Sequence, residues 1–451
     1  MSRSVAAQRL GTAPPAPKRL TVVRAWLCRR RYPLLAATAL IAVGMFTTTW
    51  GSPLTRALEA ALTGKTAFAL PADLWSTLTA ARRILHMDLG GLYTEPTGLI
   101  SFPGAALILV PVAVLIEATG LGFAAPSAVN PHPAAWLLAG PYEVALSGVA
   151  LLAADSIAER LNVNQPKRAL LAAAGAVALG NVSLAGGHPE DAVAVGLFLA
   201  GILALSNARD RRSAWLVGAA VAVQPVVLLA LPVILAVTEP RRLAGYLTRA
   251  AAPAALLLGI AAAANGKATF KAVTSQPNWP AVDHTTPWVA LVPHMSGGAV
   301  SAGPSRALAI LAACGCAIIV RHRWPGGRHA SAWSPEFFQD LLWWVAAALA
   351  LRCAFEPVMV AYYVWPAIAV ALVAASSRWS RLIPTSLAAV ILTFVSGAGW
   401  RGPWTWWGSM VTGLGLILMA ARISQRHRVS QATRSAWRFG CGSRDAVRRR
   451  G

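Results

Sequence analysis

Apolar stretches of about 20 residues recur through most of the chain, and a helix of this length crosses the hydrocarbon core of a bilayer. Of the 451 residues, 56% are hydrophobic and 13% are charged, and the mean hydropathy is +0.55. A water-soluble protein of this length does not bury so large an apolar fraction. The sequence therefore predicts an all-α, polytopic membrane protein.

The apolar stretches predict about ten full crossings and two broken or re-entrant segments. The broken segments are 102–120, which contains Pro111, and 213–238, which is interrupted at Gln224-Pro225. Broken helices are tolerated at membrane depth where protein or a cavity surrounds them. The predicted full spans are 33–51, 137–158, 168–186, 190–207, 249–264, 305–320, 336–354, 358–376, 381–398 and 404–421.

The formal charge of +23 is concentrated at the two ends and in a few connections. Basic flanks of apolar spans mark the cytoplasmic side and suit anionic lipids. We therefore expect cytoplasmic tails at 1–32 and 422–451, a membrane domain at 33–421, and a location in the cell membrane. The external loops are then 52–101 and 265–304. The charge distribution argues against nucleic acid as a partner and leaves membrane lipids as one.

Two basic patches flank the apolar segment 213–238, which a single crossing would not allow. One patch includes Arg211-Arg212 and the other Arg241-Arg242. We therefore expect two half-helices that meet at Gln224-Pro225 and return to the cytoplasm. The apolar run after Arg31 is too long for the core of a signal peptide and is interpreted as a retained first span.

The five cysteines do not form a metal-ligand or disulfide pattern. Cys314 and Cys316 fall on opposite faces of a predicted helix, and the others lie in or beside spans or in the tails. The chain also has no glycine-rich phosphate loop in a supporting context. No cofactor and no metal site is predicted, although the sequence does not exclude a divalent cation.

The stretch 71–93 concentrates ionisable groups in the first external loop, on a predicted amphipathic helix from Leu74 to Leu85. Asp73 is a candidate general base, and Arg82 and Arg83 are candidates to neutralise a phosphate leaving group. Asp88 and Tyr93 are candidate substrate contacts. The alternative is a solvated loop whose charges pair with one another.

A second cluster of ionisable residues lies in the glycine turn between two predicted spans. His188, Glu190 and Asp191 follow Gly186-Gly187. The carboxylates would lie at a helix amino terminus, where they also act as ordinary caps. Capping explains one acid, so a substrate-binding role for all three stays open beside it.

Aromatic and polar residues recur near the external ends of later spans. Tryptophans at a membrane surface are usually interfacial anchors, and the alternative is a platform for a sugar ring or a lipid head group. A carboxylate such as Glu356 near a span end favours a cavity wall over lipid contact. The candidate substrate contacts in these segments are Asn278, Trp279, His284, Trp288, Glu356, Tyr362 and Tyr363.

A series of short motifs along the chain resembles membrane glycosyltransferases of the GT-C fold. The resemblance is strongest to the branch that is similar to polyprenyl-phosphate-mannose-dependent mannosyltransferases. The resemblance touches most of residues 33–421. It is carried by Asp73-Leu-Trp, Ala80-Ala81-Arg82, Gly90-Gly91-Leu92-Tyr93, Phe102-Pro103, Pro111, the run from Gly186 to Asp191, Arg211-Arg212, Gly218, Gln224-Pro225 and the run from Glu356 to Pro366.

The resemblance implies a GT-C-like fold and an inverting sugar transfer on the external face. Asp73 matches the catalytic aspartate that deprotonates the acceptor hydroxyl, and Arg82 or Arg83 would offset charge on the departing lipid phosphate. The implied donor is a hexose or pentose, such as mannose, on a polyprenyl phosphate. The implied acceptor is a cell-envelope glycan or glycolipid. The chain departs from the pattern at His188-Pro189-Glu190-Asp191 and at Gln224, where relatives usually have glutamine and asparagine, and often lysine, respectively.

Two other functions remain as alternatives. A transporter or flippase for lipid-linked sugars would need polar groups at mid-membrane and access from both sides, and such folds often contain inverted repeats. The sequence shows no such repeat, and the polar groups cluster on one side. A non-catalytic envelope scaffold with the same fold is the other alternative.

Overall fold

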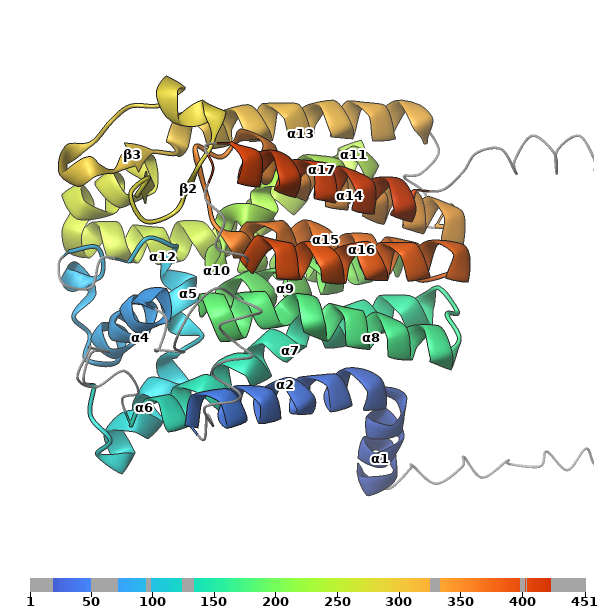
Figure 1. Cartoon of the computed structure of the whole chain (residues 1–451), viewed down its shortest axis with the longest axis horizontal. Helices are drawn as coiled ribbons and strands as arrows, with labels where there is room; N and C mark the ends of the chain where they lie inside the picture. Colours follow the sequence, from blue (N-terminus) through green and yellow to red (C-terminus); the bar gives the residue numbers. More distant parts are fainter. Residues whose placement is uncertain are drawn as a thin grey trace, which may run out of the picture.

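A computed structural model describes residues 19–49, 72–94, 99–123, 134–324, 333–397, 402 and 404–422. Figure 1 shows helices that run side by side along the horizontal direction of the view. Seven helices in the described ranges are long and apolar enough to cross a membrane. This confirms an all-α membrane protein. The predicted spans 33–51, 358–376 and 404–421 correspond to shorter apolar helices.

The first part of the chain carries the elements that later form one end of the bundle. α1 (Arg19–Arg29) and α2 (Arg31–Thr49) come first, and α4 (Ala72–Leu85) contains the predicted amphipathic helix. α5 (Pro103–Leu107) and α6 (Val110–Thr119) follow, and α6 packs against α4. In Figure 1, α4, α5 and α6 lie together at the left end, so none of them crosses the bundle.

The segment 102–120 is broken, as predicted. The helix stops at Leu107 and starts again at Val110, and Pro111 lies in the first turn of the second piece. Proline suits that position because the first amides of a helix have no carbonyl partner inside the helix. The break lies just before Pro111.

The central helices are α7 (Trp136–Arg160), α8 (Gln165–Gly180), α9 (Pro189–Ser206) and α10 (Asp210–Val223), with a π-helical turn at Asn181–Gly186. α10 stops where Gln224 adopts an extended conformation, and a 3-10 turn (Pro225–Leu229) and α11 (Leu231–Val237) follow. Arg242 Nη1 lies 2.6 Å from Asp210 Oδ2, across the two ends of this segment. The chain therefore breaks at Gln224-Pro225 and returns to the end from which it started, as predicted.

α12 (Pro240–Ser275) is longer than the predicted span 249–264. Asn265 alone leaves the helical conformation, and its side chain accepts a hydrogen bond from the amide of Ala268 (3.2 Å). Its Nδ2 also donates to the carbonyl of Gly90 (3.2 Å). An asparagine that accepts from the amide three residues ahead starts a new helical stretch. The predicted external loop 265–304 therefore begins with helix, which is a correction.

The second part of the chain adds α13 (Gly303–Arg323), α14 (Pro335–Phe355), α15 (Trp365–Ala375), α16 (Trp379–Gly397) and α17 (Thr405–Ala421). Two antiparallel ribbons lie in the connections between helices. β1 (Pro277–Asn278) pairs with β3 (Val300–Ser301), and β2 (His284–Thr285) pairs with β4 (Val358–Met359). The helix predicted to start at residue 358 therefore starts later, because residues 358–359 belong to a ribbon.

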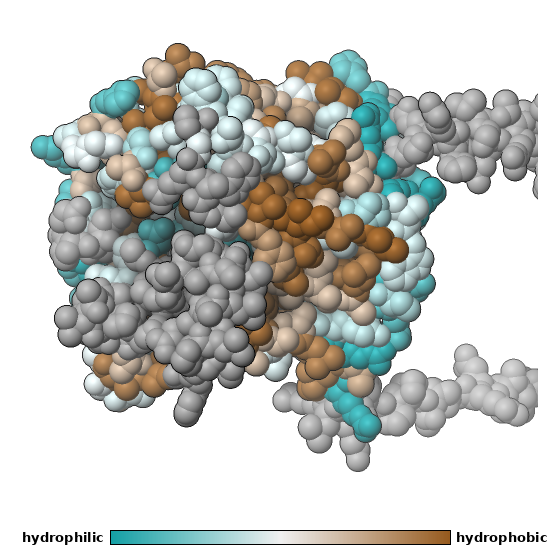
Figure 2. Space-filling view, viewed as in Figure 1, coloured by the Kyte–Doolittle hydropathy of each residue, from teal (hydrophilic) through white to brown (hydrophobic). Residues whose placement is uncertain are grey.

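The helices differ in how much of their surface the protein covers. α9 is 83% buried over its most apolar window, whereas α12 and α13 are 17% and 22% buried. α16 exposes Ile383, Leu387, Ile391 and Phe394, which are spaced to lie along one helix face. Figure 2 shows an apolar surface across the middle of this side and hydrophilic residues beside it at the right end. Such exposed apolar faces suit lipid contact.

Candidate functional site

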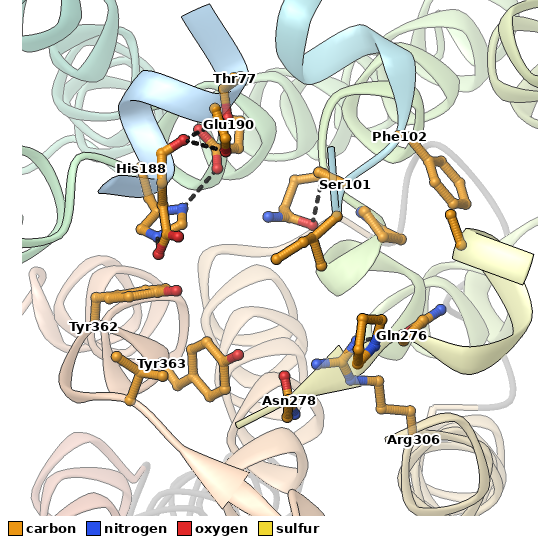
Figure 3. A pocket seen from close by; sticks show the side chains of 18 of the residues that line it. Thr77, Ser101, Phe102, His188, Glu190, Gln276, Asn278, Arg306, Tyr362 and Tyr363 are labelled. Atoms are coloured by element: carbon orange, nitrogen blue, oxygen red, sulfur yellow. Dashed lines mark hydrogen bonds and ion pairs between the residues drawn. The ribbon is translucent and has the colours of Figure 1, made fainter. Parts of the chain in front are cut away.

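A polar cavity lies where α4, the start of α9, the break after α10, the end of α12 and the segment after α14 meet. It holds about 150 Å³ of water-accessible space. Figure 3 shows His188 and Glu190 on one side and Gln276, Asn278 and Arg306 on the other. The polar lining is Asp73, Ser76, Thr77, Tyr93, Ser101, His188, Glu190, Gln224, Gln276, Asn278, Asp283, Arg306, Arg352, Tyr362 and Tyr363.

His188 joins two carboxylates on one wall of this cavity. Its Nε2 lies 3.0 Å from Asp73 Oδ2, and its Nδ1 lies 2.7 Å from Glu190 Oε1. The histidine is 9% exposed and Glu190 is 2% exposed, whereas the side chain of Asp73 is 52% exposed. The wall thus has a buried carboxylate, a buried imidazole and a carboxylate that reaches the open cavity.

Local sequence explains how these groups meet. Gly187 has a φ of 67°, a conformation that suits glycine, and it turns the chain so that His188 precedes the first turn of α9. Glu190 and Asp73 lie in the first turns of α9 and α4. Both carboxylates therefore lie at the positive end of a helix dipole.

The charge of His188 follows from its neighbours. Burial alone lowers the pKa of a histidine, because it disfavours the charged form. The negative charge of Glu190 and the hydrogen bonds to Asp73 and Glu190 outweigh this effect and raise the pKa of His188 well above its ordinary value. At neutral pH, an imidazolium therefore connects Asp73 to Glu190.

The opposite wall carries two arginines around a buried glutamate. Arg306 Nε donates to Glu356 Oε1 (3.0 Å), and Arg306 also donates to the side chain of Gln276. Arg352 Nε lies 3.8 Å from Glu356 Oε2. Asn278 Nδ2 donates to the same glutamate (2.9 Å). Glu356 is 1% exposed, so it orients these three residues from behind the cavity wall.

Two tyrosines connect the two walls. The ring of Tyr362 lies 4.0 Å from that of His188, between centroids, and 5.1 Å from that of Tyr363. The guanidinium of Arg352 lies 3.5 Å from the ring centroid of Tyr363. The buried Nη1 of Arg352 has no hydrogen-bond partner among the described residues. It is therefore a free donor beside the cavity.

A second cavity, of about 90 Å³, adjoins the first at the arginines. The two share Gln224, Pro225, Gln276, Arg306 and Arg352. The rest of the second lining is mostly apolar and includes Val226, Leu228, Leu229, Ala309, Ile310 and Phe355. The polar cavity and the apolar cavity thus adjoin at the positively charged side chains of Arg306 and Arg352.

Eight of the residues singled out in the sequence line the polar cavity. They are Asp73, Tyr93, His188, Glu190, Asn278, Trp279, Tyr362 and Tyr363. Tyr93 is a hydrogen-bond donor to the carbonyl of Ser101 (3.2 Å), and burial raises its pKa. Glu356 lines the adjoining cavity. Asp191 is fully buried and lines neither cavity, which corrects its expected placement as a substrate contact.

Arg82, Arg83 and Asp88 lie outside the lining of both cavities, which corrects their expected placement. Arg82 pairs with Glu117 (2.9 Å), and Arg83 pairs with Asp88 (2.6 Å). The two arginines follow Asp73 by nine and ten residues on α4, which places them about 14 Å further along the helix axis. Of the charges in this loop, only Arg83 and Asp88 pair with each other, as the alternative predicted; Arg82 pairs with Glu117 on α6, and Asp73 contacts His188.

His284 and Trp288 also lie outside the cavity lining. The ring of His284 stacks on Trp406 with centroids 3.9 Å apart. Trp288 Nε1 donates to the carbonyl of Ala354 (2.5 Å). Both residues hold the segment between α12 and α13 against the end of the bundle.

Sequence reasoning missed the two arginines that do line the cavity. Arg352 lies in the apolar helix α14, and a cation in such a segment usually faces a polar interior. That signal was present in the sequence. Arg306 lies near the start of α13, where a basic residue resembles an ordinary flank of a span.

The described residues contain no group of three histidine, cysteine, aspartate or glutamate side chains arranged to hold a metal ion. The arrangement offers a carboxylate, Asp73, that lines the same polar cavity as two arginines, Arg306 and Arg352. This can support acid–base chemistry beside an anionic group.

Comparison with known proteins gives no relative. No family model, no curated protein and no solved structure matches this chain.

Proposed function

We propose that the chain is a membrane glycosyltransferase that moves a sugar from a polyprenyl phosphate to a hydroxyl group of a cell-envelope glycan or glycolipid. One observation carries the proposal: a polar cavity with Asp73 on one wall meets an apolar cavity at Arg306 and Arg352. A polyprenyl-phosphate sugar has three matching parts, namely a polar sugar, an anionic phosphate and an apolar chain.

Asp73 is the proposed general base. Its carboxylate is exposed to the cavity, and His188 Nε2 fixes one of its oxygens at 3.0 Å. The acceptor hydroxyl would give its proton to Asp73 while its oxygen attacks the anomeric carbon. The bond between that carbon and the phosphate oxygen breaks, and polyprenyl phosphate leaves with the bonding electrons. Attack opposite the leaving group inverts the anomeric centre.

We assign to Arg306 and Arg352 the phosphate-binding role that was predicted from the sequence for Arg82 and Arg83. Guanidinium groups bind phosphate oxygens through paired, charge-assisted hydrogen bonds. Glu356 holds both arginines at the junction of the two cavities. Preorganised cations at this position would stabilise the charge that develops on the leaving phosphate.

The aromatic residues suit a bound sugar. Trp279 lines the cavity and is 40% exposed, and Tyr362 and Tyr363 lie on the wall between Asp73 and the arginines. Their faces offer apolar contact area, while Ser76, Thr77 and Gln276 offer hydrogen-bonding groups. Such a mixture is typical of pockets that orient a polyhydroxyl ligand.

The placement of the polar groups favours a transferase over a flippase. A flippase needs a polar route between both membrane faces. In the described part of the chain, the polar cavity shares no lining residue with the basic hollow around Arg209 to Arg212. A continuous polar route is therefore not supported.

Membranes that contain the protein are incubated with radiolabelled polyprenyl-phosphate sugars, and labelled glycan or glycolipid is measured. Asp73→Asn removes the proton acceptor and keeps the shape, so transfer falls at least about 100-fold. Asp88→Asn is the matched control, because Asp88 pairs with Arg83 away from the cavity. Normal transfer by Asp73→Asn would contradict the assignment. Movement of intact donor across vesicles without transfer would identify a flippase.

A further inference from the structure

A third cavity, the basic hollow, lies at the end of the bundle opposite the polar cavity. It holds about 680 Å³ of water-accessible space between the α9–α10 turn and the first turns of α12. α9 leads from His188 to this hollow over 18 residues, which corresponds to about 27 Å along the axis. The two sites are therefore separated by roughly the thickness of a bilayer core.

Six arginines from two separate segments surround this hollow. Arg209, Arg211 and Arg212 come from the α9–α10 turn, and Arg241, Arg242 and Arg249 come from α12. The segments are brought together because α10 packs along α12. Tyr246 Oη lies 3.0 Å from Ser213 Oγ and holds the floor of the hollow.

The carboxylates near this hollow neutralise only part of its charge. Asp210 and Glu239 both pair with Arg242, at 2.6 Å and 2.9 Å. Arg249 donates to the carbonyl of Gly245 (2.6 Å). No carboxylate of the described chain pairs with the other four arginines. Cations that converge on one space repel one another, and an anion between them removes that repulsion.

Apolar side chains beside the hollow place it at a membrane surface. Trp215, on the second turn of α10, is 51% exposed, and Leu247, on α12, is 38% exposed. Tryptophan is enriched where hydrocarbon meets the polar headgroups. A ligand with an apolar part beside its anionic part fits this combination better than a free anion does.

We propose that this hollow binds the headgroup of a phospholipid that carries two phosphates. Arg209, Arg211 and Arg212 would hold one phosphate, and Arg241 and Arg249 the other. Basic pockets between helices at a membrane surface commonly hold such headgroups. The excess of arginines on this side places the lipid in the cytoplasmic leaflet. The site is independent of sugar transfer.

Binding is measured on the full-length protein in detergent by native mass spectrometry, with diphosphatidylglycerol as the probe and phosphatidylcholine as the neutral reference. The paired substitution Arg211→Gln and Arg241→Gln should weaken retention of diphosphatidylglycerol by about tenfold or more. The control pair, Arg160→Gln and Arg321→Gln, removes the same charge from exposed positions outside the hollow. It should leave retention unchanged.

Three results would overturn the proposal. Equal loss of lipid in both pairs would show a general charge effect, and unchanged retention in the first pair would show that the hollow is not the site. Displacement of the lipid by micromolar inorganic pyrophosphate would show that the hollow takes a soluble anion. Circular dichroism and gel-filtration profiles that match the native protein show that a loss of lipid is not a loss of fold.

Discussion

At the scale of single residues, the candidate site depends on His188, which connects the exposed carboxylate of Asp73 to the buried carboxylate of Glu190. Its two nitrogens contact Asp73 and Glu190, so neither can move without losing a hydrogen bond. The side chain does not need to touch substrate to matter. It fixes the direction in which Asp73 accepts a proton.

Replacing His188 with glutamine tests this positioning role. The variant keeps Asp73 but loses the imidazolium, so kcat should fall by about 100-fold while the KM for the donor changes little. Rates of sugar transfer at several donor concentrations separate the two parameters. A large rise in KM with normal kcat would assign His188 to donor binding instead.

The raised pKa of His188 predicts a pH dependence of stability. A group whose pKa is higher in the folded than in the unfolded state stabilises the fold fully below its unfolded pKa, about 6.5 for histidine. This contribution is lost as the pH rises through the folded-state pKa. The difference in Tm between the native protein and His188→Gln should therefore be largest at acidic pH and shrink at alkaline pH. A difference that grows with pH would show that His188 is neutral in the fold.

Arg306 provides the residue-scale test of the phosphate site. Arg306→Gln should raise the donor KM about tenfold or more, because it removes a charge-assisted contact with the phosphate. Arg83→Gln is the matched control, since Arg83 pairs with Asp88 outside both cavities. If Arg83→Gln raised the KM and Arg306→Gln did not, the original assignment from the sequence would be restored.

At the scale of elements, the start of α5 approaches the end of α10 closely beside the cavity. A Cβ atom at Gly104 would lie 2.2 Å from the carbonyl oxygen of Ala222. Ser101, just before α5, also donates to the carbonyl of Val223 (3.4 Å). Only glycine at position 104 allows the two elements to pack at this distance.

Gly104→Ala should therefore separate α5 from α10 and destabilise the protein by about 1–3 kcal/mol, as other overpacked sites do. Thermal unfolding in detergent measures the loss. Gly259→Ala is the matched control because a Cβ at Gly259, on α12, meets nothing within 4 Å. Gly104→Ala with native Tm would show that the elements shift without cost.

At the scale of the whole molecule, the bundle has two chemically different ends. One holds the polar cavity, and the other holds the basic hollow. The apolar helix faces between them are exposed, as on α16. This arrangement suits a protein whose two ends face different aqueous compartments.

Cysteine labelling tests this orientation. In a variant whose native cysteines are replaced by alanine, Met87→Cys and Val282→Cys should react with an impermeant reagent added outside the cell, because both positions are exposed near the cavity end. Arg321→Cys, exposed at the end of α13, should react only after the membrane is opened. Labelling of Met87→Cys from the cytoplasmic side alone would invert the topology.

The sequence determined the helical segments and their breaks. Apolar length and charge predicted nearly every helix, and Pro111 and Gln224-Pro225 marked the interruptions. These signals can be read from the sequence because each affects the backbone only within a few residues of its own position. Asn265 was not recognised as a kink inside α12, since its effect depends on whether the helix resumes beyond it. Residues 1–18 and 423–451, which include most of the predicted tails, lie outside the described residues.

Only the tertiary structure decided which polar groups share a site. Asp73 and His188 are far apart in the chain yet 3.0 Å apart in space, whereas Arg82 and Arg83, on the same helix as Asp73, point to other partners. Arg306 and Arg352 reach the cavity because Glu356 holds them there. Local sequence patterns determine where helices begin and end, because helix formation depends on residues close to one another in the chain. The positions of ionisable side chains depend instead on contacts between segments that are distant in the sequence.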